Sequence, residues 1–310
     1  MRILITGGAG FLGSALANTL VTSGHEVLAL DDLSAGDPGR LDTRVLLHRG
    51  SITDRPKLWT LLQGVDCVYH LAARVLVAES LLYPKDYNEI NVGGTVILLE
   101  ALRDVGVPRL VLASSGAVYG DQAQQPVVET TPPNPLSPYA VSKLAAEHYV
   151  HTIGRLAGIE TIALRIFNAY GPTQSLLHTA HSPVVPRFMH QALGGGSLVI
   201  SGDGTQTRDF VYVEDVIRAM AAALMSRDLG GCTLNVGSGV ETSVNDLAQH
   251  ILALTGSNSN IIHSQAQSGG VSRLQADITL ARQRLGYQPQ VSLQEGLVRI
   301  LTEDSRLRQM

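Results

Sequence analysis

The apolar residues of the first half of the chain fall into short runs that alternate with stretches of helical periodicity. The short runs, rich in Val, Ile and Leu, predict strands near 2–6, 26–30, 44–48, 66–71, 109–113 and 160–166. The intervening stretches predict helices near 11–23, 54–63, 84–104 and 138–157. This alternation predicts an α/β fold: a doubly wound, Rossmann-type parallel sheet covered by helices on both faces.

The pattern changes after Asn168, where the chain becomes dense in turn-forming residues. Pro, His and Ser are concentrated between 171 and 186. Because such loops usually line a site, we expect a smaller C-terminal α/β lobe that binds substrate, mostly within 171–310. The cofactor-binding domain is expected over 1–170. A segment at about 210–237 is expected to return a helix and a strand to the large sheet.

A glycine-rich turn directly follows the first predicted strand. Its sequence is TGGAGFLG at 6–13, which contains the spacing GxGxxG. Glycines at this spacing let the backbone approach a pyrophosphate, whose charge then meets the start of a helix. The second predicted strand ends in Asp31 and Asp32, where a carboxylate would bind the ribose hydroxyls of a dinucleotide. Two carboxylates would repel a 2′-phosphate, so the predicted cofactor is NAD rather than NADP.

Tyr139 and Lys143 stand four residues apart at the start of the helix predicted over 138–157, so they share one helix face. Ser137 is suited to cap this helix and Pro138 to occupy its first position. A positive charge at about 4 Å favours a phenolate by about 4 kcal/mol at an effective dielectric of about 20, or about three pKa units. Tyr139 is therefore a candidate general base.

Eight motifs occur in an order that resembles the extended short-chain dehydrogenase/reductase family. They are TGGAGFLG at 6–13, DDLSAG at 31–36, HLAA at 70–73, NVGGT at 91–95, SSGAVYG at 114–120, YAVSK at 139–143, RIFN at 165–168 and RDFVYV at 208–213. The resemblance extends from residue 2 to about 290 and is closest to the UDP-glucose 4-epimerase branch. It implies NAD contacts from Gly7, Gly10, Phe11, Leu12, Asp31, Asp32, Ser34, Gly36, Ser51, Ile52, Leu71, Ala72, Ala73, Asn91, Tyr139 and Lys143.

The resemblance also implies a reaction, the 4-epimerisation of a UDP-hexose such as UDP-glucose through a transient 4-keto sugar. Tyr139 would remove the proton of the sugar 4-hydroxyl while the C4 hydride passes to NAD, and the hydride would return to the other face of the ring. Ser115 would hydrogen-bond the reacting oxygen, and Lys143 would hold the nicotinamide ribose and lower the pKa of Tyr139. Asn168 and Arg208 would contact the nucleotide diphosphate.

Several departures from the family pattern bear on the substrate. Dehydratases and decarboxylases of the family carry a glutamate two residues past the Ser or Thr, where this chain has Ala117. Thr173 stands where uronate epimerases carry an arginine, which argues against a uronic acid. The usual second phosphate-binding arginine is replaced by QSGG at 267–270, which leaves Arg273 as a substitute. Leu274, at the position that governs a 2-acetamido group, leaves that choice open. A 4-ketosugar reductase and a non-catalytic NAD-binding protein are further alternatives.

Composition limits the partners. The chain has 310 residues, 45% of them hydrophobic, and a net charge of -4 without basic blocks, which argues against a nucleic-acid surface. Neither the two cysteines nor the HxxH pair His178 and His181 supplies enough ligands for a zinc site, so no metal is expected. No apolar run reaches about 18 residues. We expect a cytoplasmic protein without a membrane anchor, and the family likeness implies a homodimer through the helices near 90–104 and 139–157.

Overall fold

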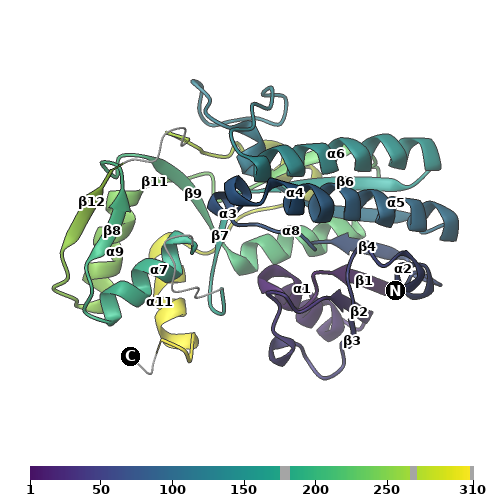
Figure 1. Cartoon of the computed structure of the whole chain (residues 1–310), viewed down its shortest axis with the longest axis horizontal. Helices are drawn as coiled ribbons and strands as arrows, with labels where there is room; N and C mark the ends of the chain where they lie inside the picture. Colours follow the sequence, from purple (N-terminus) through teal and green to yellow (C-terminus); the bar gives the residue numbers. More distant parts are fainter. Residues whose placement is uncertain (175–181, 266–270, 308–310) are drawn as a thin grey trace.

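A computed structural model describes residues 1–174, 182–265 and 271–307 of the chain. Its larger part is built on a 7-stranded sheet, parallel throughout, with the order β10-β6-β5-β4-β1-β2-β3 (Figure 1). The strands are β1 (Arg2–Thr6), β2 (Glu26–Asp31), β3 (Leu46–Arg49), β4 (Cys67–His70), β5 (Arg109–Ser115), β6 (Glu160–Ile166) and β10 (Cys232–Val236). The predicted fold class is confirmed.

Helices cover both faces of this sheet because its strands are apolar on both sides. Ile3 and Ile5 of β1 face a core shared with α1 (Phe11–Thr22) and α8 (Val213–Met225). Leu4, between them, faces the opposite core, which the strand shares with the helices on the other face of the sheet. These are α2 (Arg55–Leu61), α5 (Gly94–Val105) and α6 (Pro138–Ala157).

The helix predicted over 84–104 is interrupted. The chain forms α3 (Val77–Leu82), α4 (Pro84–Tyr87) and a π-helix, η2 (Asn88–Gly93), before α5 begins at Gly94. Two consecutive glycines have low helix propensity, and π-turns within helices are frequent at functional sites. The periodicity of the segment therefore predicted its helical character but not the wide turn that contains Asn91.

A smaller lobe follows β6. It contains the sheet β7 (Asn168–Tyr170), β9 (Thr207–Tyr212) and β11 (Glu241–Ser243), and the pair β8 (Leu198–Ser201) and β12 (Ile261–Ser264). Its helices are α7 (Val184–Leu193), α9 (Val244–Thr255) and α11 (Leu293–Glu303). Helix α10 (Thr279–Leu285) lies against β10 and α8 of the larger part. Two 3-10 helices, η1 (Pro38–Arg40) and η3 (Gly116–Tyr119), lie in earlier loops. Between β9 and β11 the chain passes through α8 and β10, and β10 pairs with β6 at the edge of the large sheet.

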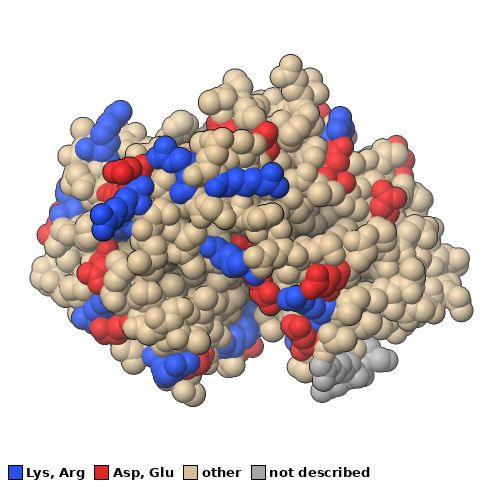
Figure 2. Space-filling view, turned by 180° about the vertical axis from the view of Figure 1, so that it is seen from behind, with Lys and Arg blue, Asp and Glu red and all other residues tan. Residues whose placement is uncertain are grey.

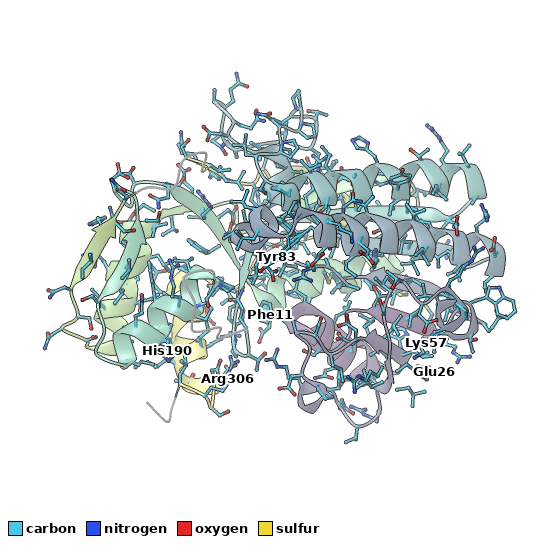
Figure 3. All side chains as sticks on the ribbon, in the orientation of Figure 1. Phe11, Glu26, Lys57, Tyr83, His190 and Arg306 are labelled. Carbon is cyan, nitrogen blue, oxygen red and sulfur yellow. The ribbon has the colours of Figure 1, made fainter. Side chains whose placement is uncertain are left out.

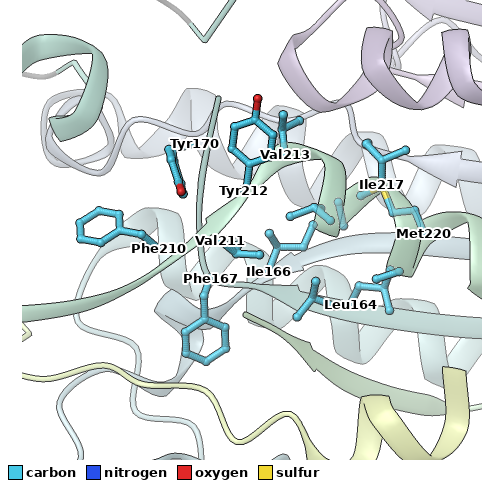
Figure 4. Packing of buried hydrophobic residues seen from close by; sticks show 14 of the residues in the cluster. Leu164, Ile166, Phe167, Tyr170, Phe210, Val211, Tyr212, Val213, Ile217 and Met220 are labelled. Carbon is cyan, nitrogen blue, oxygen red and sulfur yellow. The ribbon is translucent and has the colours of Figure 1, made fainter. Parts of the chain in front are cut away.

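One hydrophobic core joins the two parts. Tyr170 and Tyr212, whose ring centroids lie 5.5 Å apart, pack at the junction together with Phe210 (Figure 4). Leu164 of β6 and Met220 of α8 belong to the same cluster. β7 and β9 therefore connect the smaller lobe to the large sheet through packed side chains rather than through a solvated linker.

The molecular surface carries both charge signs. Figure 2 shows Lys and Arg side chains interspersed with Asp and Glu on the face behind the view of Figure 1. Within the described ranges, no helix combines the length and the apolar character needed to cross a membrane.

Candidate active site

The glycine turn lies at the carboxyl end of β1, beside β4, where the strand order of the sheet reverses. Gly7 has a φ of +70°, and a Cβ there would lie 2.7 Å from the backbone nitrogen of Ala72. A Cβ at Gly13 would lie 2.0 Å from the Gly7 carbonyl oxygen. The turn thus needs glycine for close backbone approach, as a pyrophosphate cradle does.

The start of α1 is free to receive an anion. Gly10 occupies its N-cap without a side-chain hydrogen bond, so the first N-H groups of the helix point outward without a capping side chain. Phe11 and Leu12 begin the helix and are partly buried. Figure 3 places Phe11 near the junction of the two parts, and a Cβ at Gly171 would lie 3.5 Å from its ring. This end of the sheet fits a dinucleotide.

The two acids after β2 differ in their surroundings. Asp31 is buried, and its carboxylate accepts hydrogen bonds from the backbone N-H groups of Ala9 (2.9 Å) and Leu33 (2.8 Å). Asp32 is exposed and accepts from the Ser34 N-H at 2.9 Å. Asp31 therefore ties the β2 turn to the glycine turn, while Gly36 lies against its carboxylate. An oxygen of each acid can still accept a ribose hydroxyl.

The other predicted cofactor residues lie on loops that follow neighbouring strands. Leu71 and Ala72 are held to Thr6 of β1, Leu71 N-H through the Thr6 carbonyl (3.0 Å) and Ala72 N-H through its hydroxyl (3.3 Å). Ala73 continues this loop, partly buried. After β3, the Ser51 hydroxyl bonds that of Thr53 at 2.8 Å.

Two of these residues, Ile52 and Asn91, contact other parts of the protein. Ile52, in the loop after β3, is buried beneath Gly94. Asn91 binds the backbone N-H and carbonyl of Arg74 at 2.8 and 3.0 Å, and both of its amide hydrogens are used. Asn91 thus holds the loop at 71–74 in place.

Tyr139 and Ser115 meet at the junction of α6 and β5. The helix begins as expected: Pro138 is its first residue, and the Ser137 side chain accepts from the Ala140 N-H at 3.1 Å. The Tyr139 phenol is hydrogen-bonded to the Ser115 side chain. Ser115 Oγ also accepts from the Ala117 N-H at 3.2 Å, which orients it.

The protonation of this pair differs from the sequence-based expectation. Burial raises the pKa of Tyr139, and the Ser115 hydrogen bond offsets this only in part. Burial lowers the pKa of Lys143 to about 8 against the opposing charge of Glu147. In the protein alone, the expected depression of the Tyr139 pKa by Lys143 is therefore wrong, because both groups lose hydration in the same buried site.

The Lys143 ammonium is poised to bind a ligand. The side chain is 5% exposed, and among the described residues it forms neither an ion pair nor a hydrogen bond. A buried, unpaired ammonium is costly unless a ligand supplies acceptors. Ribose hydroxyls would supply them, which agrees with the expected role of Lys143.

His70 lies between the cofactor strand and the helix layer. Its Nδ1 is 2.7 Å from the Thr6 hydroxyl and its Nε2 is 2.9 Å from the Thr95 hydroxyl. Burial lowers the pKa of His70 to about 3, with a further contribution from Lys143, so the ring is neutral at neutral pH. Thr95 donates to the Asn91 carbonyl at 2.6 Å, so it must accept from His70 Nε2-H. The tautomer is therefore fixed.

The same hydrogen-bond chain continues to α6. The Asn91 amide donates to the Ser142 hydroxyl at 2.9 Å, and Ser142 donates to the Tyr139 carbonyl at 2.8 Å. Tyr87 packs edge-on against the Tyr139 ring, with centroids 6.4 Å apart. The first turn of α6 is thus positioned by polar contacts that begin at β1.

Besides Ser115 and Tyr139, three residues were expected to contact the substrate. Asn168, at the start of β7, forms no side-chain hydrogen bond within the part of the chain that the structure describes. Arg208 donates only to the carbonyl of Thr207 at 2.6 Å, and no described carboxylate pairs with it. Arg273 differs, because it forms an ion pair with Glu241 at 2.6 Å. Asn168 and Arg208 are open to a ligand, whereas Arg273 is already engaged.

The comparisons with known proteins agree with this site. The pattern of the NAD dependent epimerase/dehydratase family matches residues 3–237. The UDP-glucose 4-epimerase of Mycolicibacterium smegmatis is 38% identical over 306 residues, covering 96% of this chain and 97% of that protein. The chain belongs to the NAD dependent epimerase/dehydratase family. Its cofactor is NAD.

Solved members of the family have nearly the same fold. The UDP-glucose 4-epimerase of Thermotoga maritima, with UDP-glucose, has a TM-score of 0.93 at 35% identity over 97% of this chain and 98% of that chain. The dTDP-glucose 4,6-dehydratase DesIV of Streptomyces venezuelae, with NAD bound, has a TM-score of 0.92 at 32% identity over 99% and 100%. A UDP-glucuronic acid 4-epimerase from Bacillus cereus reaches 0.89 at 33% identity over 100% and 99%. The fold alone does not choose between these reactions.

Some sequence-based predictions for this epimerase/dehydratase chain concern residues that the structure does not describe. His178, His181 and the QSGG run at 267–270 lie outside the described residues. Among the described residues, no three His, Cys, Asp or Glu side chains form a metal cluster. Thr173 has a φ of +64° and its N-H donates to Asp304 at 3.0 Å, so it is held by the C-terminal segment. Leu274 is buried.

Sequence reasoning missed four residues that position the site. These are His70, Thr95, Ser142 and Glu147, all buried. Glu147 follows Lys143 by four residues, so helical spacing alone places it on the face of Tyr139 and Lys143. The other three lie within the motifs HLAA, NVGGT and YAVSK, but the sequence did not indicate their positioning role, because their partners lie on distant segments.

Proposed function

We propose that the protein is an NAD-dependent 4-epimerase of a UDP-hexose of the UDP-glucose/UDP-galactose type. The observation that carries the proposal is the hydrogen bond between the partly buried Tyr139 and Ser115 side chains, on the helix face that also carries Lys143, whose ammonium has no ion pair or hydrogen bond among the described residues. Relatives named UDP-glucose 4-epimerase, at 38% and 35% identity over nearly the whole chain, support it. Ala117 also supports it, because alanine offers no base for C5 deprotonation.

The residues have distinct roles in this proposal. When bound, NAD would supply the hydride acceptor and donor for the sugar carbon. Tyr139 takes the proton of the 4-hydroxyl and later gives it back, and Ser115 hydrogen-bonds the same oxygen. Lys143 binds the nicotinamide ribose. When the Lys143 ammonium and a ligand are both in place, their positive charge favours the phenolate form of Tyr139.

The substrate contacts follow from the open groups. The Arg208 guanidinium, without a carboxylate partner among described side chains, is suited to a diphosphate. Asn168 adds an amide from the neighbouring strand β7. Arg273 reaches a phosphate only by exchanging Glu241 for it. We therefore assign Arg208 as the main phosphate contact and Arg273 as an auxiliary one.

A direct experiment distinguishes the reactions. The pure protein is incubated with a panel of UDP- and dTDP-sugars, and the products are resolved by NMR. We expect interconversion of UDP-glucose and UDP-galactose with no added NADH. Loss of water, loss of carbon dioxide or stoichiometric NADH consumption would instead identify a dehydratase, a decarboxylase or a reductase. Bound NAD with no change in any sugar would indicate a binding protein.

We also propose a homodimer. Helix α6 exposes a stripe of large apolar side chains, namely Val141, Tyr149 and Leu156, with exposed fractions of 52%, 46% and 79%. These positions recur along one face of the helix. Sedimentation at micromolar concentration is expected to give the mass of two chains, and a monomer there would remove the proposal.

A further inference from the structure

Glu147 forms a buried fork with Arg165 behind the candidate active site. Its Oε1 accepts from Arg165 Nη2 at 2.5 Å and its Oε2 accepts from Arg165 Nε at 3.1 Å. The two side chains are 5% and 6% exposed. Breaking such a buried pair by removing one partner is strongly destabilising. The pair therefore links α6 to β6, and removing one partner alone would leave a buried charge without its counter-ion.

The same carboxylate also binds β5. Glu147 Oε2 accepts from the Ser114 hydroxyl at 2.8 Å, and Ser114 lies directly opposite Arg165 in the sheet. Ser114 immediately precedes Ser115. Helix α6 thus meets the end of β5 through two polar contacts, Glu147 with Ser114 and Tyr139 with Ser115.

Glu147 also acts on Lys143 through its charge. It lies one helical turn beyond Lys143 on the same face. Burial lowers the pKa of Lys143, and the negative charge of Glu147 acts in the opposite direction. The other groups around Lys143 are Tyr139 and the neutral His70, whose own protonation Lys143 disfavours. Arg165 is directed at Glu147 rather than at Lys143.

We propose that Glu147 is a positioning residue of this active site: its carboxylate fixes α6 against the strand that carries Ser115 and places a negative charge one helical turn from Lys143. Ser114 and Arg165 are the two strand groups that orient it. The proposal concerns residues that do not touch the substrate, and only its kinetic test rests on the proposed function.

The structure supplies a matched control on the same two strands. Arg109 and Glu160 are the first residues of β5 and β6, pair in register, and form an ion pair in which Arg109 Nη2 and Nε donate to the same oxygen, Glu160 Oε2, at 2.5 and 3.0 Å. This pair lies at the opposite end of the strands from Ser115. Its removal should disturb the packing of β5 and β6 without reaching the site.

The charge role is tested by the titration of Lys143. The chain has three lysines, Lys57, Lys85 and Lys143, so ε-¹³C-lysine NMR gives three signals, which K57R and K85R assign. In full-length protein saturated with NAD, we expect E147Q to lower the titration midpoint of Lys143 by about one pH unit. E160Q should leave it unchanged. Equal midpoints in E147Q and the unchanged protein would overturn the charge role.

E147Q leaves Arg165 unpaired and can fail to fold, so a double variant accompanies it. E147Q/R165M removes both charges, and R109M/E160Q is its control. The Lys143 midpoint should again fall in E147Q/R165M alone. This readout needs no turnover, so it stands even where no sugar is epimerised.

The positioning role is tested by Ser114→Ala, which keeps the Glu147–Arg165 pair. We expect kcat to fall about tenfold with KM and the Lys143 midpoint unchanged, because only the placement of Tyr139 against Ser115 is loosened. Ser114→Thr, which keeps the hydroxyl, should restore kcat. A kcat for Ser114→Ala equal to that of the unchanged protein overturns this role. Absence of activity in the unchanged protein would instead refute the proposed function.

Discussion

At the scale of single residues, the site depends on groups whose ordinary protonation the fold has changed. Burial raises the pKa of Tyr139 and lowers that of Lys143 to about 8. The phenol is therefore protonated in the protein alone, and its hydrogen bond to Ser115 holds it ready. We expect Tyr139 to ionise only when Lys143 and a bound ligand together supply positive charge.

Replacing Tyr139 by Phe tests the assigned base. We expect kcat to fall by a factor of about 10²–10⁴, with NAD binding nearly unchanged, because the phenol contributes proton transfer rather than affinity. Tyr149→Phe, on the exposed face of the same helix, is the control and should leave kcat unchanged. Turnover and retained NAD are both measured. Full activity in Tyr139→Phe would show that another group is the base.

Replacing Gly7 by Ala tests the cofactor cradle. Gly7 and Gly24 have φ of +70° and +85°, but only Gly7 faces backbone where a Cβ would lie. Gly24→Ala should cost about 1–2 kcal/mol of unfolding free energy and keep NAD binding. Gly7→Ala should lose NAD binding as well, measured by calorimetry. Retained affinity in Gly7→Ala would contradict the cradle.

At the scale of elements, the site is assembled where strand ends meet the first turn of α6. The hydrogen-bond chain from Thr6 through His70 and Thr95 reaches the π-helix, and Asn91 carries it to Ser142 and α6. Each donor in this chain has one acceptor. Such a network positions elements firmly, but it leaves a costly unpaired group when one member is removed.

Thr95→Val tests that network. Thr95 is fully buried, and valine has its shape without its hydroxyl, so His70 Nε2-H would lose its acceptor. We expect a loss of about 1–3 kcal/mol in the free energy of unfolding, measured with urea. Thr95→Ser keeps the hydroxyl and should retain more of the stability. Equal urea midpoints for Thr95→Val and the unchanged protein would show that the bond to His70 contributes nothing.

At the scale of the whole molecule, the two parts share one core, so we expect them to unfold together. The aromatic residues of β7 and β9 pack against β6 and α8 (Figure 4). The C-terminal segment adds polar contacts, because Asp304 accepts from the Thr173 N-H at 3.0 Å and Arg306 donates to the Gln174 carbonyl at 2.9 Å. Asn168 on β7 and Arg208 on β9, the proposed substrate contacts, are therefore held in a fixed position relative to the cofactor site.

This molecule should lose stability in mild acid through His70. Its pKa is about 3 in the folded protein against 6.5 as an ordinary value, so below pH 6.5 the unfolded chain binds one more proton. The free energy of unfolding should fall by about 1.4 kcal/mol per pH unit from this group as the pH decreases, or about 2 kcal/mol between pH 6.5 and 5. His70→Gln should reduce this slope. An unchanged slope in His70→Gln would contradict the prediction.

The periodicity of the chain was enough to predict the alternation of strands and helices, and with it the fold class. The sequence also predicted the cap of α6 by Ser137 and Pro138, because capping and periodicity act between residues close in the chain. The glycine spacing and the order of the motifs likewise pointed to NAD. These signals are local, so no partner from a distant segment was needed to interpret them.

The protonation of the site and the partners of its charged groups depend instead on how distant segments pack. Burial, which depends on the whole fold, reversed the expected pKa of Tyr139. Arg273 met Glu241 while Arg208 stayed unpaired among described carboxylates, although both arginines look alike in the sequence. Contacts such as Glu147 with Ser114 join residues far apart in the chain. Their physical origin is packing between elements, which residue spacing alone does not specify.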